Sequence, residues 1–163
     1  MRLPRSALLG EKGEGFGMVM AKLAHERLTQ AVRSAVAIET MLSWTSDYVS
    51  QREAFGRRLA DFQNTRFTIA DLKARSTMVR VFTDKCVSLF MDGGLDPVDA
   101  AMVKLVTAEL HCEAADKCLQ LFGGWGYMRE SPICRAFADA RIVKIAGGSV
   151  EIMKTIIARN VLN

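Results

Sequence analysis

Apolar and small residues recur every three or four positions through much of this chain, which is the spacing of one face of an α-helix. The longest such run lies in the first third of the chain. It contains Ala31, Ala35, Ile38, Leu42, Thr45 and Val49. We therefore expect one long helix over about residues 16–51, followed by a turn at Phe55-Gly56.

Two further stripes predict two more long helices. The second stripe contains Ile69, Leu72, Ser76, Val79, Phe82, Cys86 and Leu89. It stops at Asp92-Gly93-Gly94, and glycine commonly ends a helix. Asp96 and Pro97 then suit a helix start, as N-cap and first helical residue. The third stripe, which ends at Gly123-Gly124, contains Leu105, Ala108, Cys112, Ala115, Leu119 and Phe122.

The last fifth of the chain predicts shorter elements. Residues 132–142 can hold a short helix, and Gly147-Gly148-Ser149 is expected to form a loop before a last helix capped by Ser149. The chain is thus all-α, with three long amphipathic helices plus one shorter helix. Because each helix must bury its apolar stripe against another, an antiparallel four-helix bundle is the expected fold.

Composition and charge narrow the classes of protein. The chain has 163 residues, of which 50% are apolar and 25% charged, as in one folded globular domain. Its 22 basic and 18 acidic side chains are interspersed, which argues against nucleic-acid binding. No uncharged stretch approaches the length of a membrane span, and the first residues show no secretory signal. We therefore expect no membrane span and a cytoplasmic address.

The cysteines do not indicate a metal site. Cys86, Cys112, Cys118 and Cys134 form no CxxC pair, and the chain contains only two histidines. A structural zinc site would need tighter clustering of these residue types. Free thiols are the better interpretation, and we expect no bound metal.

Three segments break the helical pattern and are candidates for ligand binding. Residues 120–127 hold three glycines and three aromatics. Either the aromatics pack under the next segment, or the glycines let a flat or phosphorylated ligand approach the backbone. Gly147-Gly148-Ser149 repeats this chemistry before a helix N-terminus, where free N–H groups favour an anion. Residues 52–63 are either a solvated turn or a phosphate contact by Arg52, with Phe55 and Phe62 beside a ring.

These segments, taken in order along the whole chain, resemble the C-terminal helical domain of the acyl-CoA dehydrogenases. The matching pieces are Leu8-Leu9-Gly10, Gly15-Phe16, Glu26-Arg27, Arg52, Phe55-Gly56, Phe62-Gln63, Ile69-Ala70-Asp71-Leu72, residues 120–127, Asp139-Ala140-Arg141 and residues 147–154. Each piece alone is weak, and the ordered set with its spacings is specific.

The resemblance implies an FAD-dependent oxidoreductase that converts an acyl-CoA thioester to its trans-2-enoyl-CoA and passes electrons to an electron-transferring flavoprotein. It also implies a homo-oligomer, which is a tetramer in the family. The family has an N-terminal helical domain and a β domain before this bundle. Residues 1–15 are then expected to be the end of that β domain and residues 16–163 the bundle. We expect this chain alone to bind FAD weakly and to be inactive.

The resemblance also implies a catalytic base. Many members carry a glutamate in the loop before the last helix, but here that position is Gly147. The long-chain and isovaleryl enzymes carry it on the first long helix, immediately before arginine, which matches Glu26-Arg27. Glu26 is therefore the expected base, in a dry site that raises its pKa. The alternative is a surface glutamate paired with Lys22 or Arg33.

The remaining roles are carried over residue by residue. Arg27 and Gly147 are expected on the substrate side, and Ala146 departs from the aromatic often found at its position. FAD is expected to meet Arg52 at its pyrophosphate, Gly148 and Ser149 at the flavin, and residues of a neighbouring subunit near the adenine. The full set of expected FAD contacts is Arg52, Phe55, Phe62, Gln63, Gln120, Leu121, Phe122, Gly123, Gly124, Gly148 and Ser149.

Two alternatives for the function stay open. One is a non-catalytic bundle that serves self-association or partner binding. The other is a DNA-associated relative of the family, against which the absence of a basic cluster already counts.

Overall fold

The computed structural model describes residues 2–162, which contain five α-helices and one small hairpin. The helices are α1 (Gly15–Gln51), α2 (Gln63–Met91), α3 (Pro97–Phe122), α4 (Pro132–Ala140) and α5 (Val150–Leu162). The strands β1 (Glu53–Ala54) and β2 (Arg57–Arg58) form an antiparallel hairpin between α1 and α2. The predicted all-α class is therefore confirmed.

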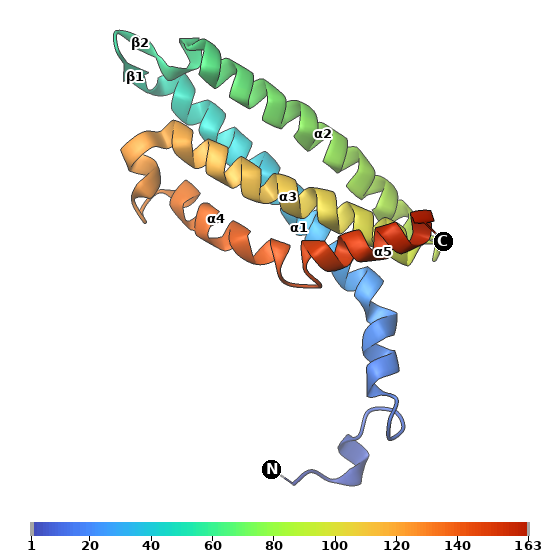
Figure 1. Cartoon of the computed structure of the whole chain (residues 1–163). Helices are drawn as coiled ribbons and strands as arrows, with labels where there is room; N and C mark the ends of the chain where they lie inside the picture. The colour runs from blue at the N-terminus through green and yellow to red at the C-terminus, as the bar shows by residue number, and fades with distance from the viewer. Residues whose placement is uncertain (1, 163) are drawn as a thin grey trace.

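The helices form an antiparallel four-helix bundle whose fourth rod is divided in two. Helices α1, α2 and α3 run up and down beside one another, and α4 and α5 follow each other along α3 (Figure 1). A 3-10 helix (Arg141–Lys144) and the turn around Gly147 separate α4 from α5. Gly147 and Gly148 both have left-handed φ, of 68° and 95°, so the chain cannot continue as one helix there.

The predicted helix boundaries follow local chemistry. The Asp96 carboxylate accepts a hydrogen bond of 2.6 Å from the Val98 backbone N–H, as expected of an N-cap before Pro97. Gly93 and Gly123, which follow the ends of α2 and α3, have φ of 72° and 57°. These left-handed values cost glycine little and end the helices where the sequence predicts.

The core confirms the apolar stripe of α1 and corrects that of α3. All six predicted positions on α1 are buried. On α3 the predicted Leu105, Cys112 and Leu119 are only half-buried. The predicted Ala108, Ala115 and Phe122 are buried, and further buried positions lie one residue before the half-buried ones, at Lys104, His111 and Cys118. Helix α3 contacts α1, α2, α4 and α5, so its buried arc is wide enough to take in three polar residues, Lys104, Thr107 and His111.

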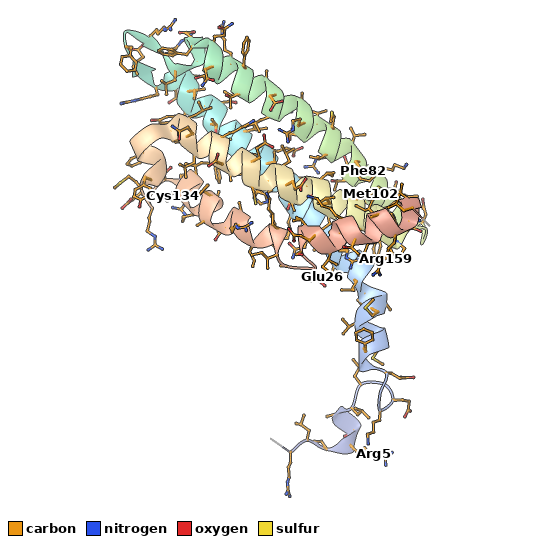
Figure 2. All side chains as sticks on the ribbon, in the orientation of Figure 1. Arg5, Glu26, Phe82, Met102, Cys134 and Arg159 are labelled. Atoms are coloured by element: carbon orange, nitrogen blue, oxygen red, sulfur yellow. The ribbon has the colours of Figure 1, made fainter. Side chains whose placement is uncertain are left out.

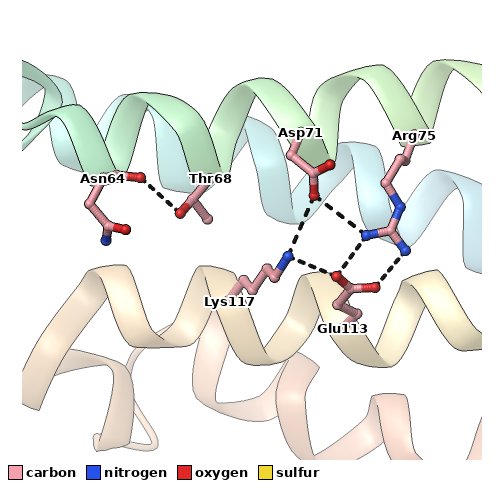
Figure 3. A network of polar contacts seen from close by, with 6 residues as sticks. All are labelled: Asn64, Thr68, Asp71, Arg75, Glu113 and Lys117. Atoms are coloured by element: carbon pink, nitrogen blue, oxygen red, sulfur yellow. Dashed lines mark hydrogen bonds and ion pairs between the residues drawn. The ribbon is translucent and has the colours of Figure 1, made fainter.

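A charged cluster joins the solvent-facing sides of α2 and α3 (Figure 3). The Arg75 guanidinium donates two hydrogen bonds to the Glu113 carboxylate, at 2.6 and 2.5 Å. Lys117 also reaches Glu113, at 2.7 Å, and Asp71 contacts both cations. Arg75 holds the pKa of Glu113 at about 2, well below its ordinary value. The cluster therefore ties the two helices together while Glu113 is ionised.

The start of the chain projects away from the bundle. Residues 2–14 hold only one short 3-10 helix (Arg5–Ala7), and the first turns of α1 extend beyond the other helices (Figure 1). The apolar side chains there are exposed, among them Leu8, Leu9 and Phe16. Within residues 2–162, no helix combines the length and apolar character that crossing a membrane requires.

Candidate functional site

The Glu26 carboxylate on α1 faces the glycine turn between α4 and α5. A β-carbon placed on Gly147 would lie 3.6 Å from Oε1 of Glu26 and 3.7 Å from Cγ of Gln30. Figure 2 shows Glu26 on α1 near the point where the fourth rod is divided. The family resemblance names Glu26 as the expected base and Gly147 as the position where other members carry theirs. The structure brings these two positions together.

The expectation that Glu26 is shielded from water is wrong for this chain. Its side chain is exposed on the surface of the bundle. In the described part of the chain, no ion pair joins Glu26 to Lys22 or Arg33, the partners of the alternative interpretation. A water-free site around this carboxylate needs protein or substrate that this bundle does not contain.

Two buried cations lie beside the turn. Arg27 and Lys104 are 7% and 1% exposed. The Lys104 ammonium donates a hydrogen bond of 2.6 Å to the Gly148 carbonyl, whereas Nε of Arg27 has no partner in residues 2–162. Burial lowers the pKa of both groups, and the charge of Arg27 lowers that of Lys104 further. The Glu26 charge opposes the lowering of the Arg27 pKa, so the three groups form one electrostatic unit.

A cavity of about 720 Å³ begins beside the turn. It lies between α1, α3 and α4, with Ala146 and Gln30 at the end nearest Gly147 and His111 deeper in its wall. Its volume falls in the range of small-molecule sites. Gln30 both lines the cavity and lies beside Gly147, so it links the cavity to the turn that faces Glu26.

The expected FAD contacts Arg52, Phe55, Phe62 and Gln63 lie in and beside the hairpin between α1 and α2. Arg52 ends α1, Phe62 caps the start of α2, and Gln63 is the first residue of α2. Phe55 is 96% exposed with a left-handed φ of 54°, and it meets the edge of Phe62 at 6.5 Å between ring centroids. The Arg57 guanidinium lies 3.9 Å above the Phe62 ring. Exposed aromatic rings beside cations suit a flat, phosphorylated ligand.

The predicted residues 120–124 lie at the end of α3, at the same end of the bundle as the hairpin (Figure 1). The Phe122 ring is buried and stacks on Tyr48 at 4.2 Å, so its side chain belongs to the core. Gly123 and Gly124 have no atom within 4 Å of a would-be β-carbon. Their backbone is therefore open to close approach by a ligand.

The expected FAD residues thus fall into two groups in one chain. The hairpin and the end of α3 form one group, and Gly148 and Ser149 lie beside Glu26 as the other. The exposed Phe55 and the open glycines fit a flavin nucleotide, which needs flat contact surfaces and close backbone approach. In the described residues, no cluster of His, Cys, Asp and Glu side chains has the arrangement of a metal site. All four cysteines are free thiols, as predicted.

Sequence patterning missed two residues of this site. The Gln30 side chain lies beside Gly147, and the Lys104 ammonium donates a hydrogen bond to the Gly148 carbonyl in the turn. Lys104 carried a signal, because it lies three residues after Ala101 and four before Ala108, on the helix face that both buried alanines share. A lysine in such a stripe needs a partner, and the partner here is a backbone carbonyl.

Comparison with known proteins places the chain in a family. Residues 13–162 match the family model described as acyl-CoA dehydrogenase, C-terminal domain. The chain is 44% identical over 163 residues to the mitochondrial long-chain specific acyl-CoA dehydrogenase of Rattus norvegicus, covering all of this chain and 38% of that protein. The chain thus spans about two fifths of the length of such relatives.

Solved structures show the same fold. The crystal structure of acyl-CoA dehydrogenase from Geobacillus kaustophilus superposes with a TM-score of 0.94 at 39% identity, covering 98% of this chain and 42% of that one. A structure described as the electron-transferring flavoprotein of Acidaminococcus fermentans matches with a TM-score of 0.93 at 30% identity, over 99% of this chain and 42% of that one. This chain belongs to the acyl-CoA dehydrogenase family and corresponds to its C-terminal helical domain.

Proposed function

We propose that this chain carries the base of an FAD-dependent acyl-CoA dehydrogenase. The observation that carries the proposal is the 3.6 Å separation between Oε1 of Glu26 and the β-carbon position of Gly147. In the family resemblance these two positions alternate as the site of the base. A carboxylate from α1 therefore reaches the place that a carboxylate from the turn would otherwise occupy.

Glu26 accepts the proton from the α-carbon of the acyl-CoA thioester. The α-carbon lies within hydrogen-bond reach of a carboxylate oxygen, as a general base requires. Loss of that proton and of a hydride from the β-carbon leaves a trans double bond between the two carbons. When bound, FAD supplies the acceptor for the hydride.

The residues of this chain that would hold FAD are those of the hairpin and of the glycine segments. Arg52 faces the pyrophosphate, with Phe55, Phe62 and Gln63 alongside. Gly148 and Ser149 approach the flavin from the turn. Residues 120–124 serve the adenine side of a second copy, and for Phe122 this contact comes from the backbone because its ring is buried.

The cavity beyond Ala146 gives the acyl group room. Its open end adjoins Gly147, and Gln30 lies at that same end. The acyl carbons beyond the reacting pair extend into this space, where Val32, Val36 and Ile142 offer apolar contact. Arg27 lies on the substrate side of the site and acts there through its charge.

The complete enzyme includes parts that precede this bundle. By the family resemblance, residues 1–15 would be the end of a β domain, and the exposed Leu3, Leu8 and Leu9 would pack against the rest of it. Without those parts Glu26 stays in water, so the isolated chain binds FAD weakly and turns over no substrate. The active form is a homo-oligomer, and it passes electrons to an electron-transferring flavoprotein. A cytoplasmic address remains a prediction, and the rat relative is named as mitochondrial.

The proposal is tested in an enzyme completed with the preceding domains. Glu26→Gln is expected to lower turnover at least about a hundredfold while the flavin absorbance is unchanged, because a positioned base contributes that much. Glu109→Gln, which removes a half-buried glutamate of α3 paired with Lys154, is the matched control and keeps wild-type turnover. Equal turnover in both variants would show that Glu26 is not the base.

A further inference from the structure

Lys104 is unusual because a charged side chain lies in the bundle core with no carboxylate of the described residues in direct contact, and only the more distant charge of Glu151 favours its charged form. It is 1% exposed, and in residues 2–162 no ion pair joins it to a carboxylate. Lysine is almost never buried this fully unless it is paired, because losing the hydration of an ammonium is costly. A methionine would fill the same position on the α3 stripe without that cost. The ammonium therefore needs a specific role.

The single hydrogen bond that the structure gives Lys104 identifies that role. Its Nζ donates to the Gly148 carbonyl at 2.6 Å, 44 residues away along the chain. Hydrogen bonds from a charged donor are about twice as strong as neutral ones. This bond is thus a strong link between the core of α3 and the turn that faces Glu26.

The turn itself has little else to fix it. Gly147 and Gly148 both adopt left-handed φ, and glycine moves freely among several such conformations. Neither backbone N–H takes part in a hydrogen bond with the described residues. The nearest backbone bonds are those of Ala146 to Ile142 and of Met153 to Ser149, on either side of the turn.

The position of the turn sets the distance between Gly147 and the Glu26 carboxylate. Gly147 stands opposite the Glu26 carboxylate and Gln30, so any movement of the turn changes the gap in which an α-carbon must fit. Gly148 also lies close to Met153, whose Cε would come within 2.9 Å of a β-carbon there. The turn is therefore held between Met153 and the Lys104 ammonium.

We propose that Lys104 is a positioning residue, whose hydrogen bond to the Gly148 carbonyl holds the Gly147–Gly148 turn at the distance from Glu26 that admits the substrate α-carbon. This inference rests on the proposed function for its catalytic consequence. Its structural half, the anchoring of the turn, stands independently. Arg27 is the second buried cation of the unit, and its charge acts on Lys104.

The structural half is tested on this chain by hydrogen exchange. Lys104→Met removes the ammonium and keeps the length of the side chain. It is expected to speed amide exchange over residues 145–153 by roughly tenfold or more, because a bond to a charged donor is lost. Thr83→Val is the matched control, since it removes a buried hydrogen bond of α2, to the Val79 carbonyl, that reaches neither Lys104 nor the turn. Unchanged exchange in Lys104→Met would overturn the proposal.

A second measurement needs no substitution. In the unchanged chain labelled with ¹³C and ¹⁵N, the proposal predicts a scalar coupling across the bond from Nζ of Lys104 to the carbonyl carbon of Gly148. It also predicts slow exchange of the ammonium protons. Absence of the coupling would contradict the anchor even if the Lys104→Met chain fails to fold.

The catalytic half is tested in the completed enzyme. Lys104→Met is expected to lower kcat roughly tenfold or more with little change in KM, because misplaced reacting groups slow the chemical step. Thr83→Val should change neither value by more than about twofold. Wild-type kcat in Lys104→Met would overturn the catalytic role. If instead Glu26→Gln retains full turnover, the proposed function fails, while the exchange experiment still decides whether Lys104 holds the turn.

Discussion

The carboxylate of Glu26 lies opposite Gly147, with Oε1 3.6 Å from the point where a side chain at that glycine would begin. These residues are far apart in the chain, on α1 and in the turn before α5. The Glu26 side chain extends toward the space that a side chain on Gly147 would occupy. Glu26, the proposed base, and Gly147 therefore share one location in the fold.

This arrangement predicts that the base can be moved. Glu26→Ala alone should be inactive, and adding Gly147→Glu should restore part of the turnover in the completed enzyme. The new carboxylate would extend from the turn into the same space. Recovery should be partial, because Gly147 has a φ of 68° and a left-handed conformation costs other residues about 1–2 kcal/mol.

Steady-state turnover with flavin absorbance as a check on cofactor content measures this rescue. Gly147→Gln on the Glu26→Ala background is the matched control, with the same size and strain but no carboxylate. Equal activity in the two double variants would refute the shared location of the base.

The size of residue 146 should set which acyl groups fit. Ala146→Phe would fill the cavity end beside Gly147, so we expect a loss of about tenfold or more in kcat/KM for long acyl-CoA substrates and little loss for short ones. A series of chain lengths measures the effect. A uniform loss across the series would show that the acyl group does not enter this cavity.

The charged cluster of Asp71, Arg75, Glu113 and Lys117 should make the free energy of unfolding depend on pH. The pKa of Glu113 is about 2 in the folded chain, below its ordinary value of 4.5. Its stabilising effect is therefore present above about pH 4.5 and is lost as the pH falls toward 2. Because Arg75 and Glu113 remain about a third exposed, solvent screens their attraction, and we expect about 1 kcal/mol or less.

Urea unfolding of wild type and Glu113→Gln between pH 7 and 3 measures this contribution. The difference in free energy of unfolding should shrink as the pH falls. Glu109→Gln, whose partner Lys154 is more exposed, is the control and should show a smaller change. A difference that stays constant with pH would show that Glu113 ionisation does not stabilise the fold.

His111 should add a second pH dependence in a higher range. Burial, together with the charge of Arg33, lowers its pKa below the ordinary value of 6.5. As the pH falls through 6.5, the unfolded chain binds a proton that the folded chain excludes, so the fold loses stability. His111→Leu should remove this part of the slope between pH 7 and 5, measured by thermal unfolding. A slope that persists in the variant would exclude His111 as its source.

The bundle was predictable because its signals are local. Helix starts and ends depend on neighbours in sequence, such as Asp96 at its N-cap and Gly123 at the end of α3. The long stripe of α1 was predicted correctly because one face of that helix is buried. Half of the α3 stripe was predicted correctly and the other half one position away, because a helix surrounded by four others buries polar residues as well.

The site was predictable only in part. Family resemblance named Glu26 and Gly147, and the structure adds that they face each other. The shielding of Glu26 from water was predicted wrongly, because the bundle alone leaves this side chain exposed. Excluding water from it needs protein or substrate beyond these residues. Lys104 was missed because its partner is a backbone carbonyl, which leaves no trace in the sequence.

The most direct test of the account is the cleavage of the α-carbon–hydrogen bond itself. An acyl-CoA deuterated at the α-carbon is incubated with the completed enzyme, and the loss of deuterium to water is followed by mass spectrometry. Wild type should wash out the label, and Glu26→Gln should do so at least about a hundredfold more slowly with its flavin still bound. Washout at the wild-type rate in Glu26→Gln would contradict the assignment of Glu26 as the base.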